Sequence, residues 1–330
     1  MASLTPPTSA LSQDQLEAYL AHIGLPADPG ADPKPAAHRK LNLPFLTQLL
    51  EHQICAVPYE NLGMHYSRDK VISLDVQNLF DKCVGNGGGS QSRGRGGYCL
   101  ESTLLFNHVL RALGFYAWIV GARARPRVNG VPQGDYTGWL HTVNIVKFPD
   151  GSRYMVDVAY GGDLSTKPLL LDPSPEGTIS HNSIGTQQVR LVRGPIPGLL
   201  SGEKLWRYEY RNNSPGQDNQ WNACFCFAEA EFLPQDLEVM NVYTSRDPRC
   251  FLAASVLVVR FLRNAETGGI YGKRMLVNAE VKENLDGKTA VVRTCRTEAE
   301  RVAALRELLG IELTEEEVQG IKGTAVELSG

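Results

Sequence analysis

The sequence predicts an α+β protein in which helices come first and strands follow. Apolar residues recur with helical spacing in four N-terminal stretches, at 11–23, 44–54, 75–84 and 99–113. From residue 116 to about 235, apolar and β-branched runs lie between turn signals, which predicts strands. Strand patterns return at 253–294, and helical patterns close the chain at 297–309 and 314–321. This order divides the chain into three segments: 1–115, 116–235 and 236–330.

Two low-complexity stretches interrupt the first segment. Residues 26–37 are rich in proline and alanine, which predicts a linker after the first helix. Residues 85–94 contain mostly glycine, serine and asparagine, a composition typical of a flexible loop. That loop ends directly before the glycine-rich turn on which the functional argument depends.

Composition and charge narrow the class of protein. The 330 residues carry a formal net charge of −3, which gives no global basic character for binding nucleic acid. No run of 18 apolar residues predicts a membrane span, and the N-terminus lacks the pattern of a signal peptide. The seven cysteines are odd in number and scattered, which predicts free thiols in a reducing compartment and a cytoplasmic protein. Cys224 and Cys226 alternate along a strand, so we expect no metal site there.

The stretch Gly94-Arg95-Gly96-Gly97-Tyr98-Cys99 delivers a thiol to the first turn of a helix. The helix is predicted from Cys99 to Leu113, and Gly114 is placed to end it. Unpaired backbone N–H groups and the helix dipole at that position favour the thiolate, the nucleophilic form of cysteine. We also expect the pKa of the Cys99 thiol to be depressed because of His141, supported by Asp157, both of which lie further along the chain. A structural cysteine is the alternative that this motif alone leaves open.

A hairpin further along the chain carries the other two candidate catalytic groups. Strands are predicted at 140–148 and 153–160, joined by a turn at 149–152. His141 lies on the first strand and Asp157 on the second, unequally spaced from the turn, so that a bulge or a diagonal contact must bring them together. Because a carboxylate among valines needs a partner, the histidine ring is its natural one. The three residues predict a nucleophile, a base and an orienting group.

Four motifs together resemble the arylamine N-acetyltransferase family. Residues 95–101 (Arg-Gly-Gly-Tyr-Cys-Leu-Glu) resemble its active-site signature, and residues 58–62 (Pro-Tyr-Glu-Asn-Leu) resemble its upstream motif. The sequence around His141 and residues 156–161 (Val-Asp-Val-Ala-Tyr-Gly) resemble its histidine and aspartate segments, in the family's order. The match is strong from about 41 to 163 and weaker to the C-terminus. The chain length and the long interruption before the cysteine suggest a fungal member.

The resemblance implies a three-part fold around a papain-like cysteine-enzyme core. Residues 1–115 would form a helical bundle that carries the nucleophilic cysteine. Residues 116–235 would form a β-barrel that carries the histidine and aspartate, and residues 236–330 an α/β lid.

The resemblance also implies an activity. The family transfers an acyl group from acyl-coenzyme A to the nitrogen of an arylamine, arylhydrazine or N-hydroxyarylamine, by ping-pong kinetics through an acyl-cysteine. The expected co-substrate is acetyl-CoA by family habit or malonyl-CoA, with no metal, no nucleic acid and no membrane as partner. Two alternatives stay open: a thiol hydrolase or amidase on the same core, and a non-catalytic binding protein. The sequence predicts neither the physiological amine nor the oligomeric state.

The resemblance assigns roles to further residues. Arg95 and Glu60 would form a buried ion pair beneath the site, a structural role. The remaining assignments are coenzyme contacts at Thr137 and Gly138, for which an ordinary turn is the alternative, and acceptor contacts at Tyr59, Ala124 and Tyr160. Tyr160 stands where the family usually has phenylalanine, and Ala159 replaces a glycine, a change that would narrow the pocket.

Arg249 occupies a position where the family has a small hydroxyl-bearing residue. A solvated arginine is the default interpretation. The alternatives are a contact to a coenzyme phosphate and a contact to a carboxylate on the acyl group. A malonyl donor is predicted if Arg249 or Arg123 faces the acyl tail.

Overall fold

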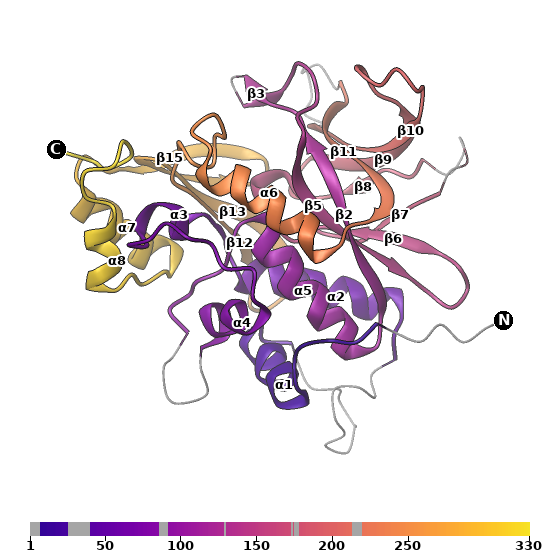
Figure 1. The fold of residues 1–330 in the computed structure, drawn as a ribbon, viewed down its shortest axis with the longest axis horizontal. Helices are drawn as coiled ribbons and strands as arrows, with labels where there is room; N and C mark the ends of the chain where they lie inside the picture. The colour runs from indigo at the N-terminus through magenta and orange to yellow at the C-terminus, as the bar shows by residue number, and fades with distance from the viewer. Residues whose placement is uncertain are drawn as a thin grey trace.

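The computed structural model describes residues 7–25, 40–85, 92–128, 130–172, 174, 178–212 and 220–330 (Figure 1). The predicted linker at 26–37 lies outside these ranges, as does most of the predicted loop at 85–94. The described chain combines helices with two large antiparallel sheets and one two-stranded sheet, as the sequence predicts for an α+β protein.

Within the described part of the N-terminal third, five helices are present. They are α1 (Gln13–His22), α2 (Leu43–Ala56), α3 (Leu62–Tyr66), α4 (Val76–Val84) and α5 (Cys99–Leu113). Side chains cap three of them, because Ser12, Asn42 and Asp75 each accept a hydrogen bond from the first turn that follows. The predicted bounds of α5 are confirmed, and Gly114 ends it in the left-handed conformation. The short α3 was not predicted.

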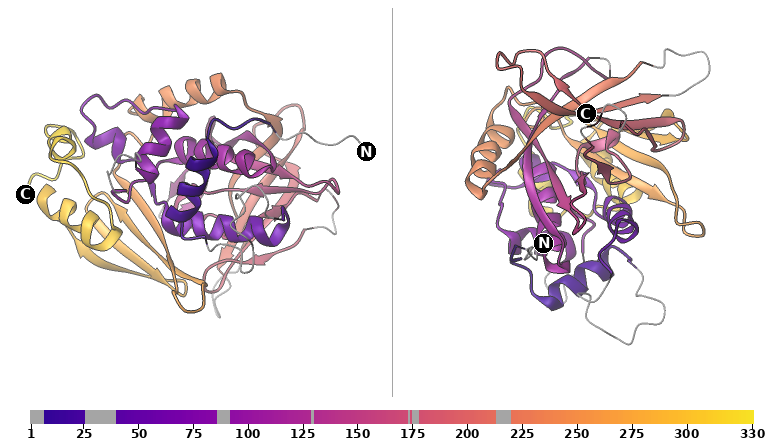
Figure 2. Two further views of the ribbon diagram at one scale, coloured as in Figure 1. Left: turned by 90° about the horizontal axis from the view of Figure 1, so that it is seen from below. Right: turned by 90° about the vertical axis from the view of Figure 1, so that its right-hand side faces the viewer.

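The larger sheet has eight strands in the order β7-β6-β5-β2-β11-β10-β9-β8, and every neighbouring pair is antiparallel. Their bounds are β2 (Tyr116–Ala124), β5 (Trp139–Lys147), β6 (Arg153–Val156), β7 (Leu169–Leu170), β8 (His181–Asn182), β9 (Gln187–Pro195), β10 (Lys204–Asn212) and β11 (Asn222–Glu231). A small hairpin, β3 (Arg127–Val128) and β4 (Val131–Pro132), stands apart. The sheet is strongly curled (Figure 2). Because β7 and β8 end the order of the described strands, closure into a barrel stays a prediction.

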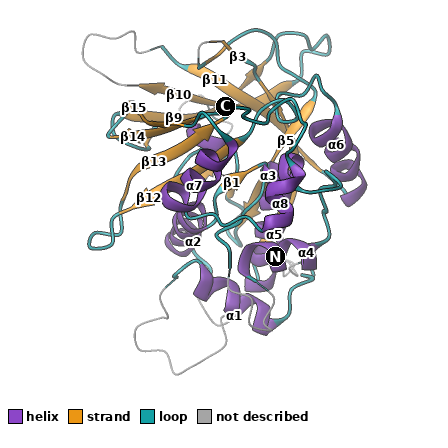
Figure 3. Cartoon of the chain, turned by 90° about the vertical axis from the view of Figure 1, so that its left-hand side faces the viewer, coloured by secondary structure: helices purple, strands orange, loops and turns teal. Residues whose placement is uncertain are grey.

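The second sheet combines one strand from the N-terminal third with four strands from the C-terminal part of the chain. Its order is β1 (Tyr59–Glu60), β12 (Leu257–Arg263), β13 (Ile270–Val277), β14 (Glu280–Leu285) and β15 (Lys288–Thr294). The short β1 pairs with β12, so a strand from the N-terminal third completes a C-terminal sheet. The helices α7 (Glu298–Leu309) and α8 (Glu315–Gly320) follow, and α8 lies beside α3 (Figure 3). The helix α6 (Pro234–Arg246) lies where strands were predicted to end, and the sequence analysis did not predict it.

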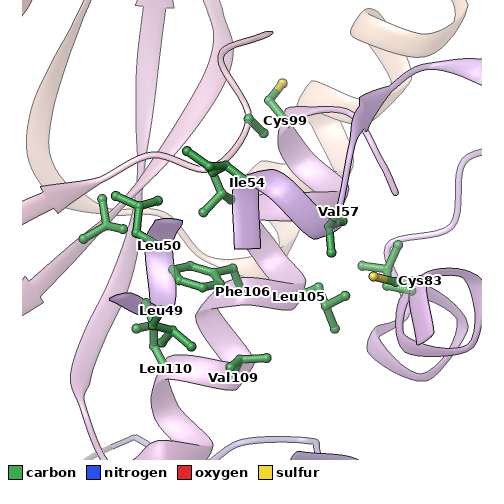
Figure 4. Packing of buried hydrophobic residues seen from close by; sticks show 14 of the residues in the cluster. Leu49, Leu50, Ile54, Val57, Cys83, Cys99, Leu105, Phe106, Val109 and Leu110 are labelled. Atoms are coloured by element: carbon green, nitrogen blue, oxygen red, sulfur yellow. The ribbon is translucent and has the colours of Figure 1, made fainter. Parts of the chain in front are cut away.

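The largest core is continuous across the three predicted segments. Leu49, Leu50 and Ile54 of α2 pack against Phe106 and Leu110 of α5 (Figure 4). The same cluster includes residues of β2 and β6 and, from the last segment, of α6 and β12. The three-domain division therefore stays a prediction, since the segments share apolar packing. None of the helices in the described ranges is both long and apolar enough to cross a bilayer.

Candidate active site

Cys99 begins α5 and lies at the edge of the main core. Its sulfur points away from the other labelled side chains in Figure 4. The residue is 3% exposed, and its Sγ lies 3.5 Å from the carbonyl oxygen of Leu140, the residue before His141. The structure thus places the candidate nucleophile against the strand that carries the candidate base.

The pKa of the Cys99 thiol differs from the expectation. Burial raises this pKa, and the nearby Asp157 carboxylate raises it further, while the backbone N–H groups of Leu100 and Cys99 lower it by less. The helix N-terminus therefore does not depress the pKa of the thiol by itself, because desolvation outweighs the backbone N–H groups. A thiolate at this position needs a positively charged partner.

The turn before Cys99 requires glycine because other backbone approaches it closely. The N–H of Glu60 donates to the carbonyl oxygen of Gly97 at 3.1 Å, which lays the turn against β1. A Cβ on Gly96 would collide with the carbonyl oxygen of Pro58, and one on Gly97 would lie 2.6 Å from the Cβ of Glu101. The absence of side chains at these two positions lets the turn pack beneath the nucleophile.

His141 and Asp157 form a buried hydrogen-bonded pair. The Nε2 of His141 lies 2.8 Å from the Oδ2 of Asp157, and the other oxygen of Asp157 accepts from the N–H of Ala159 at 2.8 Å. The β5–β6 register pairs Asn144 with Val156, so Asp157 would face position 143 and His141 lies two residues along. The contact is diagonal, which settles the alternative that the sequence left open. The strand β6 ends at Val156 rather than at 160. The side chain of Asp157 accepts a hydrogen bond from the N–H of Ala159, two residues further on, and this local contact replaces the strand pairing.

Polar contacts hold β5 against the first turns of α5. The hydroxyl of Thr103 donates to the carbonyl oxygen of Thr142 at 3.2 Å. The hydroxyl of Thr142 in turn donates to the carbonyl oxygen of Cys99 at 3.5 Å. One helical turn further, the side-chain amide of Asn107 donates to Asn144 at 2.7 Å. These buried contacts fix the strand that bears His141 relative to the helix that bears Cys99.

Two aromatic side chains lie beside the ring of His141. The ring of His141 lies 5.0 Å from that of Tyr160 and 5.1 Å from that of Phe225, between ring centroids. Phe225 was not predicted, and it pairs across the strands with Ala124, one of the predicted acceptor contacts. Burial raises the pKa of Tyr59, and the Cys99 thiol adds to the shift, so this tyrosine lies near the nucleophile. The predicted acceptor residues therefore lie around the triad.

A buried charge network supports the glycine-rich turn. The Nε of Arg95 lies 3.0 Å from Oε1 of Glu60, as the resemblance implies, and the Nζ of Lys82 lies 3.3 Å from the same oxygen. Lys82 also contacts Glu101 at 2.8 Å, and the carboxylate of Glu101 accepts from the N–H of Tyr98 at 3.1 Å. Sequence reasoning missed Lys82 and Glu101. The position of Glu101 in the first turn of α5 was a usable signal, whereas Lys82 has none in the sequence.

Replacing Glu60 is expected to destabilise the fold in a pH-dependent way. Burial opposes ionisation, but Arg95 and Lys82 outweigh it and lower the pKa of Glu60 from 4.5 to about 2. A lowered folded-state pKa contributes stability that is present above pH 4.5 and is lost as the pH falls toward 2. Glu60→Gln should lower the free energy of unfolding by about 3 kcal/mol at pH 7, because it leaves buried cations without their partner.

Urea unfolding followed by tryptophan fluorescence measures this effect. The difference from the wild type should shrink as the pH approaches 2. Glu203→Gln, an exposed glutamate, serves as the control and should change stability little. A difference that is independent of pH would contradict the ionised Glu60 described here.

Two of the three predicted coenzyme contacts, Gly138 and Arg249, are exposed, and Thr137 is half-buried. The hydroxyl of Thr137 donates to the carbonyl oxygen of Ala124 at 3.0 Å, and Gly138 is exposed, with open space where a Cβ would be. The side chain of Arg249 is 78% exposed. Its Nε donates to Oδ1 of Asp247 at 2.9 Å, and its Nη2 donates to Oδ2 at 2.7 Å. Neither Arg249 nor the turn at 137–138 contacts the triad directly in the interactions described.

Arg123 lies over the indole ring of Trp139, with its guanidinium carbon 3.9 Å from the ring centroid. It also donates to the carbonyl oxygen of Thr137 at 3.2 Å. These contacts hold the guanidinium of Arg123 against the beginning of the neighbouring strand, β5. Arg123, like Arg249, therefore already has partners for its guanidinium.

Solved structures share this fold over nearly the whole chain. The arylamine N-acetyltransferase of Nocardia farcinica superimposes with a TM-score of 0.73 and 27% identity, covering 94% of each chain. The Mycobacterium marinum arylamine N-acetyltransferase in complex with CoA gives a TM-score of 0.70 at 23% identity and covers 93% of this chain and 98% of its own. The second likeness concerns the fold alone. Together the fold and the arrangement of the site define the class as arylamine N-acetyltransferase-like.

Sequence comparison identifies the family. A family model described as N-acetyltransferase matches residues 42–318. A protein of Fusarium pseudograminearum named N-malonyltransferase FDB2 is 34% identical over 328 residues, covering 94% of this chain and 92% of its own. Human arylamine N-acetyltransferase 1 is 34% identical over 236 residues, 71% of this chain and 73% of its own. The chain belongs to the arylamine N-acetyltransferase family and is an acyltransferase of that family.

Proposed function

We propose that this protein transfers an acyl group from acyl-coenzyme A to the nitrogen of an aromatic amine, hydrazine or hydroxylamine through an acyl-Cys99 intermediate. The observation that carries the proposal is the arrangement of three buried residues. Cys99 lies against the strand of His141, and the Nε2 of His141 is held 2.8 Å from Asp157. A nucleophile, a base and an orienting carboxylate are the parts that acyl transfer through cysteine requires.

The first half-reaction would begin with a proton transfer. Because Nε2 of His141 is hydrogen-bonded to Asp157, Nδ1 is the ring nitrogen left to take the proton of Cys99. The imidazolium then supplies the positive charge that a buried thiolate needs. The thiolate attacks the thioester carbonyl of acyl-CoA, the coenzyme thiol leaves with the proton, and an acyl-cysteine remains. The backbone N–H of Cys99 is a candidate donor to the transient oxyanion.

In the second half-reaction the amine nitrogen attacks the acyl-cysteine. His141 takes the proton that the nitrogen loses, and the Cys99 thiolate is the leaving group. Cysteine suits both steps, since exchange between two thioesters of similar sulfurs is nearly balanced. Two half-reactions at one sulfur imply ping-pong kinetics.

A thiol hydrolase or amidase is the second candidate, because the same triad could deliver the acyl group to water. The burial of Cys99 favours the transferase, since it limits the access of water to the acyl-cysteine. The test is to measure release of free coenzyme A with and without an aromatic amine. A transferase should release it much faster with the amine and form the N-acyl product. Equal release in both conditions would support the hydrolase.

The proposed donors are acetyl-CoA and malonyl-CoA. The Fusarium relative is named an N-malonyltransferase, and the neighbouring Mycobacterium marinum structure is a complex with CoA, which supports acyl-CoA as the co-substrate. The thiol of Cys250 is among the groups that raise the pKa of Cys99, so the segment that carries Arg249 lies near the nucleophile. We propose that Arg249 exchanges Asp247 for the carboxylate of a malonyl group or for a coenzyme phosphate.

Arg249→Ser separates these roles. If Arg249 binds the malonyl carboxylate, the variant should lose about tenfold or more in kcat/KM for malonyl-CoA and little for acetyl-CoA. Equal losses would assign it to a part of the coenzyme that both donors share. Arg246→Ser, an exposed arginine at the end of α6, is the matched control. Unchanged kinetics with both donors would show that Arg249 is a solvated surface residue.

We also propose a cytoplasmic location. All seven cysteines are free thiols, as predicted, and this supports a reducing compartment.

A further inference from the structure

The residues just before the nucleophile turn are held by the C-terminal end of the chain. Both Arg93 and Arg95 form ion pairs with Glu317 of α8. The N–H of Glu312 donates to the carbonyl oxygen of Arg93 at 2.9 Å. Between the two arginines, Gly94 adopts a positive φ of 68° and packs so tightly that a Cβ would collide with the backbone carbonyl of a C-terminal residue. Contacts to the C-terminal segment thus fix the position of residues 93–95.

The charge count of the network depends on Glu317. Its cations are Lys82, Arg93 and Arg95, and its carboxylates are Glu60, Glu101 and Glu317. Arg95 is 3% exposed and lies between the carboxylates of Glu60 and Glu317. The three cations are balanced only when Glu317 is present. Without it, a net positive charge would lie under the turn that carries Cys99.

The carboxylate of Glu317 is itself fixed in place. Its Oε2 accepts from the N–H of Thr314 at 2.8 Å, and the hydroxyl of Thr314 accepts from the N–H of Glu317 at 3.2 Å. This reciprocal capping box anchors the side chain at the start of α8. A carboxylate held on one side by its own helix can hold the two arginines on the other.

We propose that Glu317 is a positioning residue for Cys99. By fixing Arg93 and Arg95, it fixes the start of the turn at 94–97, and the turn sets where the sulfur lies relative to the strand of His141. The inference rests on the proposed acyl transfer through Cys99. The competing interpretation is that Glu317 only stabilises the fold, in which case Cys99 would react at the normal rate in every folded molecule.

Single-turnover acylation of Cys99 distinguishes the two. Glu317→Gln removes the charge and keeps the side-chain length, and Glu316→Gln, an exposed neighbour on the same helix, is the matched control. Each variant is mixed with acetyl-CoA or malonyl-CoA, and the acylated fraction is followed by intact-protein mass spectrometry. The folded fraction is measured by circular dichroism in the same buffer at low temperature. We expect Glu317→Gln to acylate about ten- to a hundredfold more slowly per folded molecule at saturating donor, because a small misplacement of a reacting group costs that much.

The half-saturating donor concentration should stay near that of the wild type, since the surface that binds coenzyme is not altered. Glu317→Asp is the second variant, and it covers the case in which Glu317→Gln does not fold. It keeps the charge on a shorter arm, and it should show an intermediate loss of rate. Equal rates per folded molecule in Glu317→Asp and Glu316→Gln, or in Glu317→Gln and Glu316→Gln, would overturn the inference. Failure of the wild type to acylate at Cys99 would instead overturn the proposed function.

Discussion

Cys99→Ala is expected to abolish acyl transfer while leaving the fold intact. The substitution removes a single sulfur atom from the start of α5, so its effect on packing is small. No other atom at this position can carry the acyl group, and we expect a loss of about a thousandfold or more in kcat. The measurement is the rate of amine acylation with either donor, with thermal unfolding recorded to verify the fold.

Cys250→Ala is the matched control for this prediction. Cys250 is buried near the nucleophile and is also a free thiol, but it does not begin a helix. The control should retain most of its activity. If Cys99→Ala keeps substantial transferase activity, or if the acyl group is found on Cys83 or Cys250, the assignment of the nucleophile is wrong.

His141→Ala is expected to slow the alkylation of Cys99 sharply at neutral pH. Burial and Asp157 raise the pKa of the Cys99 thiol, so without the imidazole the thiolate forms only in the alkaline range. In the wild type a proton transferred to His141 leaves a thiolate paired with an imidazolium. Alkylation by iodoacetamide should therefore be fast at and below neutral pH in the wild type, and should rise only at high pH in the variant.

The rate of alkylation from pH 5 to 9, followed by mass spectrometry, makes the comparison. His181→Ala, which replaces a partly buried histidine at β8, should leave the profile unchanged. Asp157→Asn should impair turnover as well, because Asp157 holds the Nε2 side of the ring. Identical profiles for the wild type and His141→Ala would remove His141 from the mechanism.

The local parts of the site could be predicted from the sequence because local signals encode them. The apolar period from Cys99 and the stop at Gly114 gave α5 its bounds, and the turn at 149–152 gave the hairpin of β5 and β6. The spacing of His141 and Asp157 limited their contact to a bulge or a diagonal, and only the register decided between them.

The non-local parts could not be predicted in this way. Arg95 and Glu317 are 222 residues apart, and nothing in either neighbourhood names the other. The two residues of β1 form a strand only because β12 lies beside them. Helix α6 exposes Val239 and Val242, so its apolar residues do not mark a single buried face. The burial that raises the pKa of the Cys99 thiol is likewise non-local, because the helix terminus is visible in the sequence and the desolvation is not.

The most direct test of acyl transfer through Cys99 uses the wild-type protein and no amine. The protein is incubated with acetyl-CoA or malonyl-CoA, its intact mass is recorded, and the modified peptide is sequenced. The account predicts a mass increase of one acyl group located on Cys99, which disappears when an aromatic amine is added. An unmodified protein that still acylates amines, or a modification on another residue, would contradict it.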